Sequence, residues 1–218
     1  MPSATAGWPA EQSPPDRRIV LIADDDPLLR SSLDSLFRSV GLETRLFASA
    51  RDVMDAQFPD ATCCIVMDIR MPRMSGLEFQ AQLNARGLRV PIIFITGHGD
   101  IPMSVKAMKA GAFDFMTKPF RDQEMLDAVE AALSRDGDRR SQDKALADSR
   151  TRYEALTPRE KEVMAGVTRG LLNKQVAAEL GISEITVKLH RSSLMKKLEV
   201  RAFADLVRLA EALGVNNG

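Results

Sequence analysis

Acidic side chains stand at two points of the chain where a short apolar run ends. Three consecutive aspartates, Asp24 to Asp26, follow one such run, and Asp68 follows another. Clustered carboxylates repel one another unless a cation lies between them, and Mg²⁺, which prefers oxygen ligands, is the natural choice. The metal would also neutralise a transferring phosphoryl group. The pattern therefore predicts phosphoryl chemistry with Asp68 as the nucleophile.

Two further polar side chains follow the later apolar runs. Thr96 ends the run that begins at Pro91, and its hydroxyl can donate a hydrogen bond to a phosphoryl oxygen. Lys118 follows the run Ala112–Met116 and brings an ammonium group. Each residue alone has an ordinary interpretation as a helix cap, a strand residue or a solvated charge. Their order and spacing favour one shared site.

The elements that position these residues are five apolar runs alternating with segments of helical spacing, such as Leu28–Val40 and Gly76–Leu83. Strands that are apolar on both faces and joined by helices predict an α/β doubly wound, five-stranded parallel sheet. Sites in such sheets lie at the carboxyl ends of the strands. The strands are expected at Ile19–Ala23, Thr44–Phe47, Cys63–Met67, Pro91–Ile95 and Ala112–Met116.

Length and composition favour two domains. The chain has 218 residues and 44% hydrophobic content, enough for two separate cores. The adjacent Cys63 and Cys64 suit reduced core thiols and a cytoplasmic protein better than a disulfide framework. Residues 1–16 are expected to be a disordered leader without a signal peptide, and no run reaches the roughly 18 apolar residues of a membrane span.

A polar segment separates the predicted sheet domain, residues 17–134, from a helical one. Residues 135–155 are too polar to form a core and are expected to be a partly helical linker. The sequence does not decide whether this linker forms a coiled coil. After it, Thr157 caps a helix that ends near Gly170. Further helices are expected over Asn173–Leu180, from the cap Ser183 to about Leu198, and over Phe203–Leu213. Residues 156–218 therefore form a small all-α domain, and the chain from Arg150 onward carries a formal charge of +4.

The third helix of this domain has two distinct faces. Val187, His190, Leu194 and Leu198 share one face and are expected to point into the core. The opposite face presents Ile185, Lys188, Leu189, Ser192 and Lys196. Alone, this helix could be an ordinary solvated amphipathic helix. A short capped helix and a glycine turn precede it, however, and together they form the helix-turn-helix pattern that places a helix in the DNA major groove.

Over about Arg18 to Leu133 the sequence resembles the receiver domain of two-component response regulators, particularly the FixJ-like branch. The motifs that carry this resemblance are Ile22-Ala23-Asp24-Asp25-Asp26, Met67-Asp68-Ile69-Arg70-Met71-Pro72, Ile95-Thr96-Gly97-His98-Gly99-Asp100 and Lys118-Pro119-Phe120. Pro27 comes one residue earlier than in the family pattern, so the resemblance gives Asp26 no role. Gly97 to Gly99 is expected to be a flexible loop rather than a phosphate-binding motif.

The resemblance implies specific roles for these residues. Asp68 is the phospho-acceptor and a Mg²⁺ ligand, Asp25 is a direct Mg²⁺ ligand, Asp24 is a water-mediated one, and the carbonyl of Arg70 completes the protein ligands. Thr96 and Lys118 bind the phosphoryl group. Phe115 is an aromatic switch that turns inward with Thr96. The Lys118–Pro119 bond is expected to be cis.

The stretch Leu156–Leu213 resembles the LuxR-type, four-helix helix-turn-helix of FixJ and NarL relatives. The shared motifs are Leu156-Thr157-Pro158-Arg159-Glu160, Asn173-Lys174 and Thr186-Val187-Lys188-Leu189-His190. The resemblance implies that Lys188, Leu189 and Ser192 approach base edges and that Lys174, Thr186 and Arg191 meet the DNA backbone. Lys196 belongs to the same DNA-facing surface, and the last helix serves dimerisation.

Taken together, these features predict a response regulator rather than an enzyme. A sensor histidine kinase phosphorylates Asp68, the protein forms a homodimer and binds promoter DNA, and RNA polymerase is a further candidate partner; no membrane partner is expected. Two alternatives stay open: a DNA-binding regulator independent of phosphorylation, and a phosphatase-like hydrolase. The hydrolase lacks the Asp-x-Asp pattern that it would need at Asp68.

Overall fold

The structure is a computed structural model that describes residues 17–97 and 101–215. The expected leader at residues 1–16 and the residues His98 to Asp100 lie outside this description. The chain divides into two compact units, Met1–Arg140 and Ser141–Gly218. Each unit buries its own hydrophobic residues, in two clusters in the first unit and one in the second.

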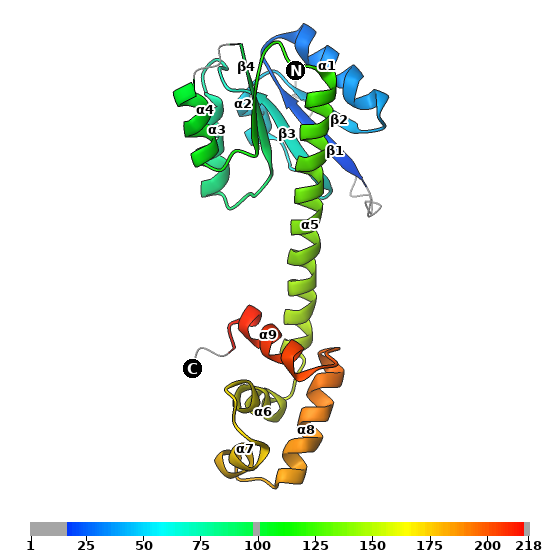
Figure 1. The fold of residues 1–218 in the computed structure, drawn as a ribbon, viewed down its shortest axis with the longest axis vertical. Coiled ribbons are helices and arrows are strands. Elements are labelled where there is room, and N and C mark those ends of the chain that lie inside the picture. The colour runs from blue at the N-terminus through cyan, green and yellow to red at the C-terminus, as the bar shows by residue number, and fades with distance from the viewer. Residues whose placement is uncertain (1–16, 98–100, 216–218) are drawn as a thin grey trace, which may run out of the picture. The chain divides into compact units, whose positions relative to one another are not determined.

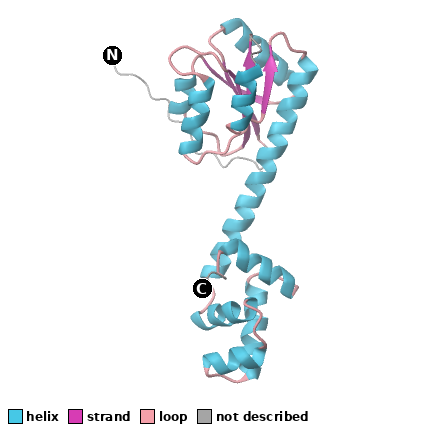
Figure 2. Ribbon diagram, turned by 60° about the vertical axis from the view of Figure 1, so that its left-hand side comes forward, coloured by secondary structure: helices cyan, strands magenta, loops and turns pink. Residues whose placement is uncertain are grey.

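The first unit is built on a five-stranded, all-parallel sheet in the order β2-β1-β3-β4-β5. The strands alternate with helices along the chain, so the predicted doubly wound α/β fold is confirmed (Figures 1 and 2). The strands are β1 (Arg18–Ala23), β2 (Glu43–Phe47), β3 (Thr62–Asp68), β4 (Ile92–Thr96) and β5 (Asp114–Thr117). The helices that follow them are α1 (Pro27–Ser39), α2 (Ala50–Asp55), α3 (Gly76–Ala85), α4 (Ile101–Lys109) and α5 (Asp122–Glu154).

Two hydrophobic cores lie on the two faces of this sheet. Successive strand residues point to opposite faces, and Ile65 of β3 therefore packs with α2 and α3 while Val66 packs with α1 and α5. Figure 1 shows α1 and α5 on one side of the sheet and α2 to α4 on the other. Burial on both faces explains why the strands are nearly continuous apolar runs.

Cys63 and Cys64 lie inside these cores as free, buried thiols. Burial raises the pKa of Cys63 to about 11 and also raises the pKa of Cys64. Both side chains therefore stay protonated and act as packing residues.

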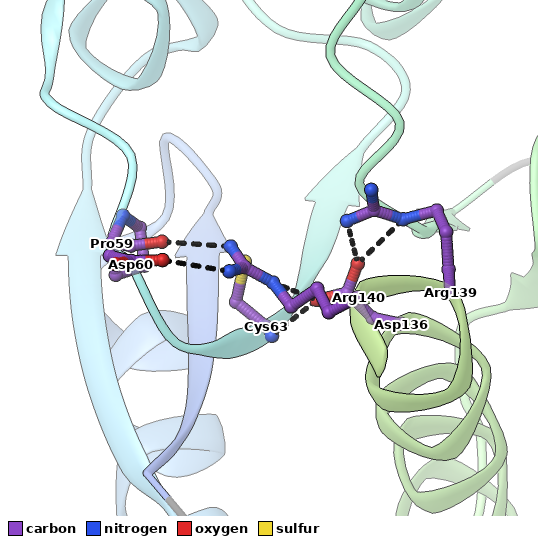
Figure 3. Close-up of polar contacts among 6 residues, drawn as sticks. All are labelled: Pro59, Asp60, Cys63, Asp136, Arg139 and Arg140. Atoms are coloured by element: carbon purple, nitrogen blue, oxygen red, sulfur yellow. Dashed lines mark hydrogen bonds and ion pairs between the residues drawn. The ribbon is translucent and has the colours of Figure 1, made fainter. Parts of the chain in front are cut away.

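Helix α5 runs to Glu154 and so covers residues 135–154 of the segment 135–155 for which a partly helical linker was expected. The first unit extends to Arg140, because a buried carboxylate holds this part of α5 to the start of β3. Asp136 is fully buried and accepts hydrogen bonds from the backbone N–H of Cys63 at 3.0 Å, from Arg139 at 2.6 Å and from Arg140 at 3.0 Å (Figure 3). Arg140 also donates to Asp60 at 3.0 Å. We call these five residues the Asp136 cluster.

The second unit contains four helices after the end of α5: α6 (Pro158–Thr168), α7 (Asn173–Leu180), α8 (Glu184–Lys197) and α9 (Phe203–Leu213). Thr157 and Glu160 form the expected capping box at α6, and Gly181 ends α7 with a positive φ of 64°. The predicted all-α domain is confirmed. None of the described helices combines the length and apolar character of a bilayer-spanning segment.

Candidate acidic site and nucleic-acid interface

The acidic site lies at the carboxyl edge of the sheet, where Lys118 joins two carboxylates. The Nζ atom of Lys118 is 2.9 Å from Oδ2 of Asp24 and 2.6 Å from Oδ2 of Asp68. Both carboxylates are buried at this edge of the sheet, and the side chain of Lys118 is one-quarter exposed. The end of β1, the end of β3 and the loop after β5 thus bring three charged groups together.

Burial and charge work against each other in this group. Burial raises the pKa of Asp24 above its ordinary value, although Lys118 and the N–H of Asp26 oppose the shift. Burial alone would lower the pKa of Lys118, but its hydrogen bonds to Asp68 and Asp24 outweigh this effect and raise it. The lysine is therefore held as a cation between two acids.

Backbone hydrogen bonds fix the remaining residues of the edge. The N–H of Arg70 donates to Oδ1 of Asp68 at 2.7 Å, and the N–H of Lys118 donates to the carbonyl of Thr96 at 2.7 Å. Thr96 ends β4, one residue after Ile95, which is in register with Asp68, and Thr96 is fully buried. The Lys118–Pro119 bond is cis, as expected.

Phe115 lies on β5 in register with Phe94 of β4. Its side chain is partly buried and packs against the core that contains α2 and α3. It thus stands between the hydrophobic core and the surface of the unit.

The three consecutive aspartates have different environments. Asp24 is buried and accepts a hydrogen bond from the N–H of Asp26 at 2.9 Å, whereas Asp25 is exposed. Asp26 caps α1, because its side chain accepts from the N–H of Leu28 at 2.8 Å and Pro27 takes the first helical position. The early proline therefore has a local explanation, and Asp26 has a structural role.

The carboxylate oxygens of this site suit a hard cation, but the structure does not bring all of the expected metal ligands together. Asp24 and Asp68 both direct a carboxylate at the ammonium of Lys118, and carboxylate oxygens are the donors that a hard divalent cation prefers. Within the described ranges, no group of three or more His, Cys, Asp or Glu side chains is arranged to hold a metal. The two buried carboxylates are the part of the expected ligand set that the fold brings together.

Arg30 is a neighbour of this site that the sequence analysis did not single out. It lies on the first turn of α1, and its guanidinium donates to the backbone carbonyl of Asp24. The sequence signal that could have identified Arg30 is a basic residue one turn into the helix that follows an acidic loop. The contact holds the loop after β1 in place from the helix side.

Helix α8 presents the face that its spacing predicts. Val187 and Leu194 are fully buried, whereas Lys188, Ser192 and Lys196 are exposed. Ile185 and Leu189, both large and apolar, are 71% and 66% exposed. This combination of basic, hydroxyl and apolar groups on one open helix face is compatible with the edges of base pairs.

Glu160 anchors α8 to α6. Its side chain is buried and accepts hydrogen bonds from Ser193 at 2.7 Å and from Lys197 at 2.8 Å, as well as from its capping partner Thr157. Burial alone would raise the pKa of Glu160, but these hydrogen bonds outweigh it and bring the pKa to about 2. From the sequence, Glu160 was visible only as a capping residue.

The expected DNA-backbone residues differ in how they are held. Lys174 is exposed on α7, and the hydroxyl of Thr186 lies 2.8 Å from that of Ser183, the cap of α8. Arg191 is partly buried: its guanidinium lies 4.7 Å from the ring centre of Phe203 and donates to Asn173 at 3.3 Å. Lys188 pairs with Glu184 at 3.2 Å.

Family models match both units. The model described as "Response regulator receiver domain" matches residues 20–130, and that described as "Bacterial regulatory proteins, luxR family" matches residues 154–210. The acidic site lies in the first match and α6, α7 and α8 lie in the second.

Several characterised proteins are similar over nearly the whole chain. Nodulation protein W of Bradyrhizobium diazoefficiens is 54% identical over 200 residues, which are 92% of this chain and 88% of that protein. The response regulator protein TodT of Pseudomonas putida is 49% identical over 195 residues, with 89% and 86% covered. The transcriptional regulatory protein FixJ of Azorhizobium caulinodans is 42% identical over 201 residues, with 92% and 95% covered.

Solved structures show the same likeness. The low-resolution structure of the response regulator StyR has a TM-score of 0.78 and 46% identity, and covers 89% of this chain and 98% of its own. Full-length FixJ from B. japonicum has a TM-score of 0.54 and 35% identity, with 91% and 98% covered.

Proposed function

Because the chain belongs to the FixJ-type response regulators, two-component transcriptional regulators that join a receiver domain to a LuxR-type DNA-binding domain, we propose that Asp68 is its phospho-acceptor. The observation that carries this proposal is the contact of Lys118 with both Asp68 and Asp24. An oxygen of Asp68 attacks the phosphorus of a phosphohistidine on a sensor histidine kinase. The P–N bond breaks, an acyl phosphate forms, and the histidine keeps the electron pair of that bond.

In this proposal Mg²⁺ would be held by Asp25, Asp68 and the backbone carbonyl of Arg70, and by Asp24 through a water molecule. When bound, the metal supplies positive charge that neutralises the phosphoryl oxygens. Lys118 adds a second positive charge from the loop after β5. Asp24 is buried and fixed by the N–H of Asp26, so it can hold a ligand position without rearrangement of its backbone.

Thr96 and Phe115 form the proposed switch. The hydroxyl of Thr96 moves toward the phosphoryl group, and Phe115, which is only partly buried, turns into the space that this movement opens. The reshaped face of α4, β5 and α5 then supports a homodimer. Two copies of α8 in such a dimer fit half-sites about one turn of DNA apart.

The proposed DNA interface consists of α8 and the start of α7. The side of α8 that faces the base edges is exposed and carries Lys188, Leu189, Ser192 and Lys196. Lys174 and Thr186 approach phosphates, and Arg191 does so with the donors that Asn173 does not use. We assign this promoter-binding activity to the cytoplasm, with RNA polymerase as a further partner and no membrane partner. Slow, Mg²⁺-dependent self-phosphorylation and dephosphorylation are the only reactions that we expect the chain to catalyse.

Incubation of the full chain with acetyl phosphate and Mg²⁺ tests the proposal. One stable phosphoryl group per chain supports it, an absence of labelling supports the phosphorylation-independent regulator, and continuing turnover supports the hydrolase. Asp68→Asn should abolish the labelling. Asp26→Asn is the matched control, since asparagine caps a helix as well as aspartate does and this variant should keep the labelling.

A further inference from the structure

Two exposed apolar residues of α8 set it apart from an ordinary basic helix. Ile185 and Leu189 are 71% and 66% exposed, while Val187 on the same helix is fully buried. They are four residues apart, so their side chains are neighbours on one face of α8. We call these two residues the apolar pair. Large apolar side chains at this exposure gain little from folding and leave most of their apolar surface available to a partner.

The polar surroundings of the apolar pair indicate nucleic acid rather than another protein. Lys188, Ser192 and Lys196 are exposed on the same part of the helix, and the pairing of Lys188 with Glu184 lies at its surface, where both side chains are about half-exposed. A protein partner would have to desolvate these ammonium groups beside an apolar contact, whereas DNA offers them phosphates and base-edge acceptors and offers base edges to the residues between them. Charge complementarity therefore favours the major groove as the occupant.

The major groove contains one apolar group of methyl size, which is the 5-methyl of thymine. The apolar pair occupies the first half of α8, and the N-terminal residues of recognition helices are the ones that reach base edges. From these observations we propose that Ile185 and Leu189 read thymine methyl groups and thereby determine which half-sites this protein selects. The inference rests on the proposed DNA-binding function and specifies its substrate: half-sites with thymines at the positions that face the pair.

Rigid support of α8 makes such a readout feasible. Glu160 holds the helix through Ser193 and Lys197, and Arg191 connects it with Asn173 of α7 and Phe203 of α9. The helix therefore cannot roll without breaking contacts to all three neighbouring helices. The apolar pair is consequently presented in a fixed direction, as discrimination between neighbouring base pairs requires.

Replacement of thymine by deoxyuridine tests this proposal, because it removes the methyl and leaves every hydrogen-bonding group of the base in place. Duplexes are first selected from a random pool with the phosphorylated full chain, and each thymine of a selected half-site is then replaced singly. We expect a loss of about threefold to fivefold in affinity at one or two positions, the effect of one buried methyl. At those positions Ile185→Ala or Leu189→Ala should bind thymine and deoxyuridine duplexes equally.

Lys174→Ala provides the control, because Lys174 is exposed on α7 and is assigned to a phosphate rather than to a base edge. It should weaken binding to thymine and deoxyuridine duplexes by the same factor and reduce the salt dependence of binding. Deoxyuridine duplexes that bind the unchanged chain as tightly as the thymine duplexes would overturn the proposal, as would alanine variants that keep the full discrimination. If no duplex were enriched at all, the proposed function itself would be wrong. Thermal unfolding of both alanine variants should match that of the unchanged chain, since neither residue is buried.

Discussion

We expect the Asp136 cluster to determine how far along α5 the first unit extends. Asp136→Ala removes the acceptor of the buried N–H of Cys63 and the partner of two arginines (Figure 3). An unsatisfied buried N–H costs about 1–3 kcal/mol. Arg139 and Arg140 are each about 30% exposed and can turn toward water, so each lost ion pair adds only about 0.5 kcal/mol. The sum is about 3 kcal/mol.

Hydrogen exchange of the full-length chain measures this loss locally. Opening that becomes easier by about 3 kcal/mol speeds exchange by about a hundredfold. The amide of Cys63 and those of α5 around Asp136 should show this increase, while the amides of β1 and β4 exchange as before. Asp136→Asn keeps one acceptor oxygen, so its exchange rates at these amides should lie between those of the unchanged chain and those of Asp136→Ala.

Asp60→Ala is the control, because Asp60 accepts a hydrogen bond from Arg140 but its side chain is 99% exposed. Its removal should cost less than about 1 kcal/mol. Equal effects of Asp60→Ala and Asp136→Ala, or no effect of either, would refute the reasoning. The apolar contacts of Ala132 and Leu133 would then be sufficient to hold α5.

Three further outcomes follow from the structure. The pKa of Glu160 is about 2 against an ordinary 4.5, so its ionised form stabilises the second unit fully above pH 4.5, and this stabilisation is lost as the pH falls toward 2. Because Lys197 is half-exposed and its charge is partly screened, we expect acid unfolding of the second unit to show a loss of about 2 kcal/mol, which should be absent in Glu160→Gln. Gly137→Ala should raise the unfolding free energy by about 0.5–1 kcal/mol in denaturant titration, since the new Cβ lies an ordinary 3.7 Å from Thr62 within a helix. Gly76→Ala should lower it by about 1–3 kcal/mol, because its Cβ would lie 2.5 Å from the buried Phe94; equal effects of both glycine changes would contradict the packing argument.

Tertiary structure alone decided the relations between distant residues. Lys118 meets Asp24 and Asp68 across 94 and 50 residues, and Asp136 meets Cys63 across 73. Such contacts depend on strand order, register and helix packing, which no local preference encodes. The same holds for Glu160, whose links to α8 are invisible in its capping motif.

The sequence by itself determined the elements and the edge at which the site lies. Apolar periodicity located the five strands, and local signals such as Thr157 before Pro158 and Gly181 after Leu180 located helix ends. These features are readable because a period or a cap involves residues only a few positions apart. Whether Asp26 faced a metal or capped α1, and whether Arg191 stood free or packed on Phe203, required the folded chain, because each choice depends on which partners the packing brings near.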